Sequence, residues 1–342
     1  MKPAIAAVTA TIVLGACTTG GPSSDRPRTV TLLTHDSFDV SEQVLKAFET
    51  DSGIDVTVLR AGDAGQVVSR AILTAGDPEG DVLFGIDDNL LHDALEAEVF
   101  TPYASPRLEA VPDAYEADPD HRVTPIDRGD VCVNVDTASF ASTDMPRSFE
   151  DLVASADELV VENPATSTPG LAFLLATIAE YGDPGFEDYW TRLRAGGVRV
   201  VDGWERAYFG EFSGAGGGEG ERALVVSYAT SPVAEVVLAE GPAERNTVLE
   251  DTCYRQIEFA GILAGAEHPE EARALIDFLL SREVQEDIPL RMFVYPVVDD
   301  ASLPAVFADN AVIPAAPLSL DAEMVAANRT DWVQRWTDVV LR

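Results

Sequence analysis

The amino-acid sequence predicts an α/β fold built around parallel strands, and three observations lead to this. Segments typical of strands and helices alternate along the N-terminal third of the chain, as in a parallel sheet with right-handed crossovers. The third strand-like segment, 81–86 (DVLFGI), is almost wholly apolar, as expected for a strand buried on both faces. At 342 residues, the chain is also long enough for a large core divided between two domains.

The elements follow in order along the chain. The first strand, 29–34 (TVTLLT), precedes a helix that starts after Ser41 as its N-cap residue and stops before Gly53. Further strands are expected at 55–59, 81–86, 131–135, 159–161, 198–201, 224–226 and 255–259. Further helices are expected near 66–74, 89–100, 170–181, 270–280 and 323–341. In the last helix Trp332 and Trp336 lie near one face, which is more typical of packing than of ligand binding.

The N-terminus has the pattern of an export signal. The apolar run at residues 4–14 is shorter than the roughly 20 residues needed to span a bilayer. It ends in LGAC, residues 14–17, which resembles a bacterial lipobox. We expect residues 1–16 to be a signal peptide, Cys17 to carry lipid, and residues 17–28 to form a flexible tether. An ordinary signal peptide with an incidental cysteine is the alternative.

The composition is that of a globular and strongly acidic protein. Hydrophobic residues make up 46% and charged residues 24% of the chain, and 59 acidic against 23 basic residues give a net charge of −36. Such a negative field repels nucleic acid and anionic lipid, and it attracts cations. We therefore expect no nucleic-acid partner, and membrane contact through the lipid anchor only. Solubility alone is the simpler explanation of the charge.

Polar and aromatic residues lie just after the expected strands or at helix starts. Ligands of open parallel sheets bind beyond the carboxyl ends of the strands, and clefts between domains are favoured pockets. Six such segments are 34–38 (THDSF), 85–91 (GIDDNLL), 166–170 (TSTPG), 203–208 (GWERAY), 227–232 (SYATSP) and 294–296 (VYP). In this order and spacing they resemble the thiamine-binding proteins of bacterial ABC importers, a family with the type II periplasmic-binding-protein fold. The resemblance runs from about Val30 to the C-terminus.

This resemblance implies a two-lobed α/β fold, in which each lobe is a mixed sheet flanked by helices and the ligand lies in the cleft between the lobes. Residues 29–128 together with 259–342 would form lobe 1, and residues 129–258 would form lobe 2. It implies a monomeric, exported and lipid-anchored binding protein, in the periplasm or at the outer face of the cytoplasmic membrane. Its ligand would be thiamine or a thiamine phosphate, handed to an ABC permease and its ATPase. No catalytic residue, cofactor or metal is expected.

The matching residues suit such a ligand. Thiamine carries a permanent cation, and aromatic faces attract cations by roughly 0.5–2 kcal/mol each, so Trp204 and Tyr228 are the first stacking candidates. Asp87 or Asp88 would offset the charge or accept from the pyrimidine amine, and hydroxyls in segment 166–170 would hold a polar tail or phosphate. The expected ligand-binding residues are His35, Asp36, Asp87, Asp88, Ser167, Thr168, Trp204, Tyr208, Tyr228, Ser231, Phe293 and Tyr295.

Each candidate also has a structural interpretation. Trp204 and Tyr228 could belong to the core, Asp87 and Asp88 could cap the helix that follows them, and a lone histidine such as His35 is commonly structural. The family often has aromatic residues at positions where this chain has His35, Asp130, Val131, Ala234 and Phe293. Because most of these rings are missing, a related ligand stays open.

The resemblance further implies that two strands crossing between the lobes run side by side. Cys132 lies in the first crossing segment and Cys253 begins the second. We therefore expect a Cys132–Cys253 disulfide at the hinge, in a compartment where disulfides persist.

Two alternatives differ in ligand or in class. The first is a binding protein for another cation, such as a polyamine, a pyrimidine precursor or ferric iron, although the four scattered histidines argue against iron. The second is a thiamine-cleaving enzyme with Cys132 as its nucleophile. Asp130 argues against it, because a neighbouring negative charge opposes formation of the thiolate.

Overall fold

The computed structural model describes residues 28–141, 144–216, 220–238 and 245–342. The predicted signal peptide (1–16), the lipidation site Cys17 and the tether up to residue 27 lie outside the described residues. Among the described helices, none is long and apolar enough to cross a bilayer.

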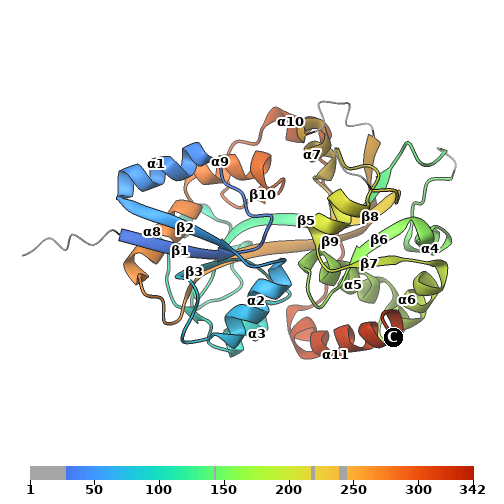
Figure 1. Ribbon diagram of the computed structural model, residues 1–342, viewed down its shortest axis with the longest axis horizontal. Helices are drawn as coiled ribbons and strands as arrows, with labels where there is room; N and C mark the ends of the chain where they lie inside the picture. The colour runs from blue at the N-terminus through green and yellow to red at the C-terminus, as the bar shows by residue number, and fades with distance from the viewer. Residues whose placement is uncertain (1–27, 142–143, 217–219, 239–244) are drawn as a thin grey trace, which may run out of the picture.

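One mixed sheet runs through the molecule, with the strand order β2-β1-β3-β9-β5-β8-β6-β7 (Figure 1). Its strands are β1 (Arg28–Thr34), β2 (Ile54–Arg60), β3 (Val82–Asp87), β5 (Thr124–Asp136), β6 (Leu159–Glu162), β7 (Arg199–Val201), β8 (Leu224–Tyr228) and β9 (Asn246–Leu263), with β4 (Phe100–Thr101) on β9 and β10 (Tyr295–Pro296) on β5. Strand β1 is parallel to β2 and β3, and β6 is parallel to β7 and β8. The predicted parallel units are thus confirmed, one at each end of the sheet.

Helices cover both ends of the sheet, and Figure 1 shows them gathered into two halves. The first half contains α1 (Glu42–Ser52), α2 (Ala64–Leu73), α3 (Leu91–Glu96), α8 (Pro269–Leu279) and α9 (Arg282–Arg291) around β1–β3. The second half contains α4 (Phe149–Ala154), α5 (Thr168–Tyr181), α6 (Gly185–Gly196) and α7 (Ser231–Leu238), followed by α10 (Ala305–Asn310) beside α7 and α11 (Ala322–Val340) beside α6. This is the predicted two-lobed α/β architecture.

Local sequence signals explain several of these boundaries. The hydroxyl of Ser41 accepts from the backbone N–H of Val44, and Gly53 ends α1 with a left-handed φ of 68°. All residues of β3 are buried, as its apolar sequence predicted. The expected helix at 89–100 is shorter than predicted, because Val99 is buried and the chain passes at once into β4.

Strands β5 and β9 are antiparallel and run from one half of the molecule to the other (Figure 1). The sequence indicated only 131–135 and 255–259, whereas β5 has 13 residues and β9 has 18. Buried polar residues such as Asp127 and Gln256 interrupt the apolar pattern, so most of each strand escaped prediction.

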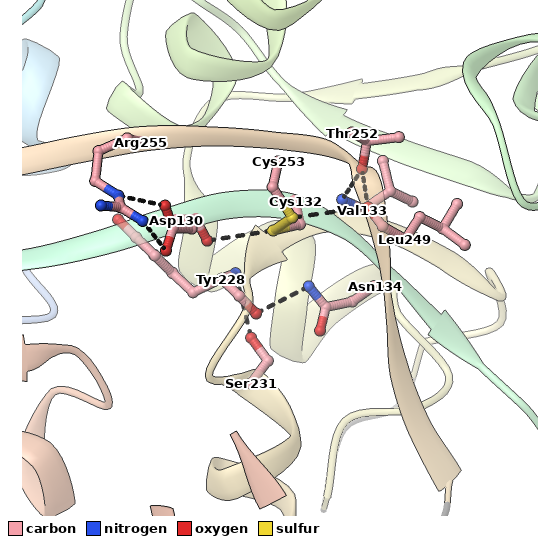
Figure 2. The surroundings of a disulfide bond; sticks show 10 residues. All are labelled: Asp130, Cys132, Val133, Asn134, Tyr228, Ser231, Leu249, Thr252, Cys253 and Arg255. Atoms are coloured by element: carbon pink, nitrogen blue, oxygen red, sulfur yellow. Dashed lines mark hydrogen bonds and ion pairs between the residues drawn. A yellow bond between two sulfur atoms is a disulfide. The ribbon is translucent and has the colours of Figure 1, made fainter. Parts of the chain in front are cut away.

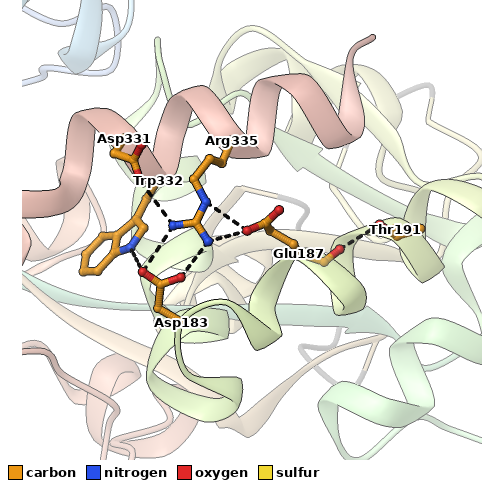
Figure 3. Close-up of polar contacts among 6 residues, drawn as sticks. All are labelled: Asp183, Glu187, Thr191, Asp331, Trp332 and Arg335. Atoms are coloured by element: carbon orange, nitrogen blue, oxygen red, sulfur yellow. Dashed lines mark hydrogen bonds and ion pairs between the residues drawn. The ribbon is translucent and has the colours of Figure 1, made fainter.

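The last helix, α11, packs on α6. Trp336 is fully buried and meets Trp190 edge-on, with ring centroids 5.4 Å apart. Figure 3 shows the polar part of this contact, where the Arg335 guanidinium bridges Asp183 and Glu187. The packing of the helix through its tryptophans agrees with the prediction. The lobe boundaries at residues 129 and 258 stay a prediction, and α11, assigned there to lobe 1, lies against a helix assigned to lobe 2.

Candidate functional site

A cavity of about 930 Å³ lies between the two halves. Its walls come from the ends of parallel strands in both halves: the residues after β1 and β2 on one side, and those after β6, β7 and β8 on the other. Ligands bind at such strand ends, and the volume falls within the range of about 300–1,000 Å³ that is common for small-molecule sites. The sheet topology therefore places this cavity where a ligand is expected.

One wall of the cavity is aromatic. Trp204 stacks on Tyr208, with ring centroids 5.3 Å and planes 19° apart, and Phe209 meets Trp204 edge-on. The indole Nε1 of Trp204 donates to the Ser227 hydroxyl at 2.9 Å, which fixes the orientation of the ring. Tyr208 is only 1% exposed, so it supports Trp204 from behind while Trp204 itself is half-buried at the cavity. Such a wall can hold a flat or cationic ring.

Tyr228 continues this wall at the end of β8. Its ring lies against Gly129, where an added Cβ would come within 2.9 Å of the Tyr228 Cδ1 atom. The glycine therefore allows the tyrosine ring to lie across β5 and face the cavity.

Acidic residues also line the cavity. Glu258 on β9 lies 3.8 Å from the Nε2 atom of His35, measured to Oε2. Burial lowers the pKa of His35, but the negative charges of Glu258, Asp63 and Asp36 outweigh it and raise that pKa overall. Gly85, with φ 98°, makes room for the imidazole, because a Cβ there would lie 2.3 Å from His35 Cδ2.

Asp63 joins the two halves next to the cavity. It precedes α2 in the first half, and its carboxylate accepts from the backbone N–H of Trp204 in the second half at 2.9 Å. Burial raises the pKa of Asp63, although the hydrogen bond from Trp204 acts in the opposite direction. A carboxylate thus lies directly beside the aromatic wall.

The structure brings most of the expected ligand-binding residues to this cavity. Those that line it are His35, Asp36, Thr168, Trp204, Tyr208, Tyr228, Ser231 and Phe293. It does not bring Asp87, Asp88, Ser167 or Tyr295 to the lining.

These four residues contact other parts of the protein instead of the cavity. The carboxylate of Asp87 accepts from the backbone N–H of Leu90 at 3.0 Å, which is the capping role weighed as its alternative. Asp88 faces the backbone of Ile257, and burial raises its pKa to about 7. Ser167 is buried at the start of α5, and Tyr295 is buried against Phe307.

Several residues that line the cavity were not predicted from the sequence. Asp63 precedes a helix whose start was predicted two residues late, although the pair of Asp63 and Gln66 is a capping-box signal. Glu258 lies within a strand, where a single acidic residue usually indicates a solvent-facing position. Phe209 and Arg60 carry no pattern that separates them from ordinary surface residues.

Metal-ligand clusters are absent from the described residues: no group of three or more His, Cys, Asp or Glu side chains there could hold an ion.

A disulfide joins Cys132 of β5 to Cys253 of β9, as Figure 2 shows. Both residues are fully buried between the strands that connect the two halves. Next to them Arg255 pairs with Asp130, with Nε and Oδ1 2.6 Å apart. The cysteine that could have served as a nucleophile is therefore part of this cross-link.

Comparisons with known proteins agree on one family. The model of the bacterial extracellular solute-binding proteins matches residues 77–326. The thiamine-binding periplasmic protein of Salmonella typhimurium is 31% identical over 320 residues, which covers 92% of this chain and 94% of the relative. The protein with the same description from Escherichia coli K12 is 30% identical with the same coverage.

Solved structures give the same result. A structure described as a periplasmic thiamin binding protein superimposes with a TM-score of 0.80 at 29% identity, over 92% of this chain and 96% of the other. A ferric binding protein from Campylobacter jejuni shares the fold with a TM-score of 0.74 at 17% identity, over 91% and 99%.

Proposed function

The chain belongs to the bacterial extracellular solute-binding proteins, and we propose that it binds thiamine or a thiamine phosphate in the cavity between its two halves. The observation that carries this proposal is the pairing of an aromatic wall, Trp204 and Tyr228, with the carboxylates of Asp63 and Glu258. Relatives of about 30% identity over nearly their whole length are described as thiamine-binding, which supports this ligand.

The chemistry of thiamine fits both sides of the cavity. Its thiazolium ring is a permanent cation, which the face of Trp204 attracts and a carboxylate balances. Its aminopyrimidine donates and accepts hydrogen bonds, for which Asp63 and the hydroxyls of Thr168 and Ser231 are available at the lining. Ring and charge would thus be recognised by neighbouring side chains.

In this proposal the protein acts in import and catalyses no reaction. The ligand would enter while the two lobes, 29–128 with 259–342 and 129–258, are apart, and closure would bury it. The closed form would then be presented to an ABC permease and its ATPase. Lipidation of Cys17 would keep the exported, monomeric protein at the membrane, provided that a second acyl chain completes the anchor.

Calorimetric titration of the purified protein with thiamine, and with its mono- and diphosphate, tests the proposal. We expect sub-micromolar thiamine binding and a change in tryptophan fluorescence. Trp204→Ala should weaken binding about tenfold or more, because a cation–π contact contributes up to about 2 kcal/mol and the wall loses its largest ring. Leu73→Ala, at a side chain 86% exposed on α2, should leave affinity unchanged.

Spermidine and ferric citrate serve as competing ligands in the same titration. Tight binding of either, with no thiamine binding, would move the ligand to another cation within the same family. Equal thiamine affinity in wild type and Trp204→Ala would contradict the assigned site.

A further inference from the structure

Three carboxyl groups lie in a row across the centre of the sheet. Glu258 on β9 is in register with Asp87 on β3 and with Asp127 on β5. Side chains opposite each other on neighbouring antiparallel strands have Cβ atoms about 4.5–5.5 Å apart. The three residues are 8%, 0% and 1% exposed, respectively, so this acid row is almost fully withdrawn from water.

The acid row has no arginine or lysine partner among the described residues. Its nearest basic group is His35, whose Nε2 atom lies 3.8 Å from Glu258. Neither carboxyl oxygen of Asp127 has a hydrogen-bond donor there. Amide groups supply the remaining contacts: Gln256 Nε2 donates to Glu258 at 3.1 Å, and both Asn89 Nδ2 and the backbone N–H of Leu90 donate to Asp87, at 3.2 and 3.0 Å.

His35 is the one basic group found next to the row in the described residues, and the other ionisable groups around it are carboxyls and a phenol. The titratable groups that face it are His35 after β1, Asp88 at the end of β3 and Tyr228 at the end of β8, and Asp36 and Asp63 lie near His35. Burial raises the pKa of Asp87 and of Asp127 well above the usual value. The neighbouring carboxylate of Glu258 raises both pKa values further, and Asp88 adds to the effect on Asp87. Burial and mutual repulsion therefore favour the protonated forms of Asp87 and Asp127.

Only the middle of this row reaches the cavity. Glu258 and His35 belong to the cavity lining, whereas Asp87 and Asp127 lie behind Glu258 on either side. A positive charge entering the cavity would meet Glu258 first, and its field would act on the whole row through a low-dielectric interior.

We propose that Glu258, backed by Asp87 and Asp127, selects cationic ligands, and that the bound cation displaces a proton from the acid row into solvent. This inference rests on the proposed function, because it names thiamine as the displacing cation. The exchange balances in charge: one positive ring enters beside Glu258, and one proton leaves the row through the cavity. Binding that releases protons becomes tighter as the pH rises, over the range in which the row is protonated.

Calorimetry of the purified protein with thiamine, in buffers of different ionisation enthalpy at one pH, measures the protons released. We expect a release of up to about one proton per thiamine bound, and a matching rise in affinity with pH. The neutral analogue in which carbon replaces the charged ring nitrogen should release none. It should bind about ten- to a hundredfold more weakly, since a contact to a charged group contributes about 1.5–3 kcal/mol.

Variants separate the two parts of the inference. Glu258→Gln should lose both the proton release and the preference for thiamine over its neutral analogue. Asp127→Asn should release fewer protons but keep that preference, because it removes one of the two buried carboxyls whose pKa is raised and leaves Glu258 at the cavity. Glu250→Gln, an exposed position on the same strand, is the matched control and should behave as wild type.

The outcomes are distinct. Thiamine binding without proton release, or with equal affinity for the neutral analogue, would overturn this inference and leave the proposed function in place. Absence of thiamine binding would overturn the proposed function, and with it the role assigned to Glu258.

Discussion

Removing the Cys132–Cys253 disulfide should cost a large part of the protein's stability. The two cysteines are 121 residues apart in sequence, and the chain-entropy relation assigns about 5 kcal/mol at 25 °C to closing a loop of this length in the unfolded state. Measured losses for native disulfides are about 2–5 kcal/mol, so this value is the upper limit for the double variant Cys132→Ala/Cys253→Ala. The closed loop contains β6, β7 and β8, so the second half of the molecule should be affected most.

Denaturant unfolding of the double variant and of wild type measures the loss in free energy of unfolding. Wild type treated with a reductant is the matched control, because it opens the same loop without changing a side chain. Hydrogen exchange should show that amides of β6 and β8 lose more protection than those of β1 and β2. A loss below about 1 kcal/mol, or equal loosening of both halves, would refute the reasoning from loop closure.

Two further predictions concern packing and charge. Trp336→Ala should lower the free energy of unfolding by about 3–5 kcal/mol in denaturant unfolding, because it removes a fully buried ring between α11 and α6. Met324→Ala, at an exposed position on α11, should change it by less than about 0.5 kcal/mol. Asp127→Asn should raise stability at neutral pH but not near pH 4 in thermal unfolding. The folded state holds a proton on this buried carboxyl that the unfolded state releases above about pH 4, so wild-type stability falls as the pH rises through this window. An unchanged pH profile would contradict the raised pKa of Asp127.

The sequence predicted the parallel units and the aromatic wall because both depend on local pattern. Strand β3 was visible as an apolar run, and Trp204 and Tyr228 stood out as aromatic residues just after strands. The expected site residues that do not line the cavity are those whose position depends on the direction of the chain in the folded protein. Asp87 and Asp88 follow a strand as ligand groups often do, but the turn into α3 directs Asp87 to a backbone N–H instead of the cavity.

The acidic side of the cavity was invisible for a different reason. A carboxyl within a strand is expected to face water, since burial of an unpaired charge is costly. Glu258, Asp87 and Asp127 contradict that expectation together, because three neighbouring strands place them opposite one another. Register between strands distant in sequence cannot be seen from any single segment, so only the folded sheet reveals the row.

The strands that carry this row are also the strands that connect the two halves. Strand β9 holds both Glu258 and Cys253, and β5 holds both Asp127 and Cys132, five residues from the row in each case. A charge that enters beside Glu258 therefore acts on the cross-linked pair of strands about which the halves would move. Asp63 also lies near His35, and its hydrogen bond to Trp204 already links the halves. A cation held beside Glu258 and Asp63 would also meet Trp204 and so contact both halves, and cation binding and closure of the cavity should therefore favour each other.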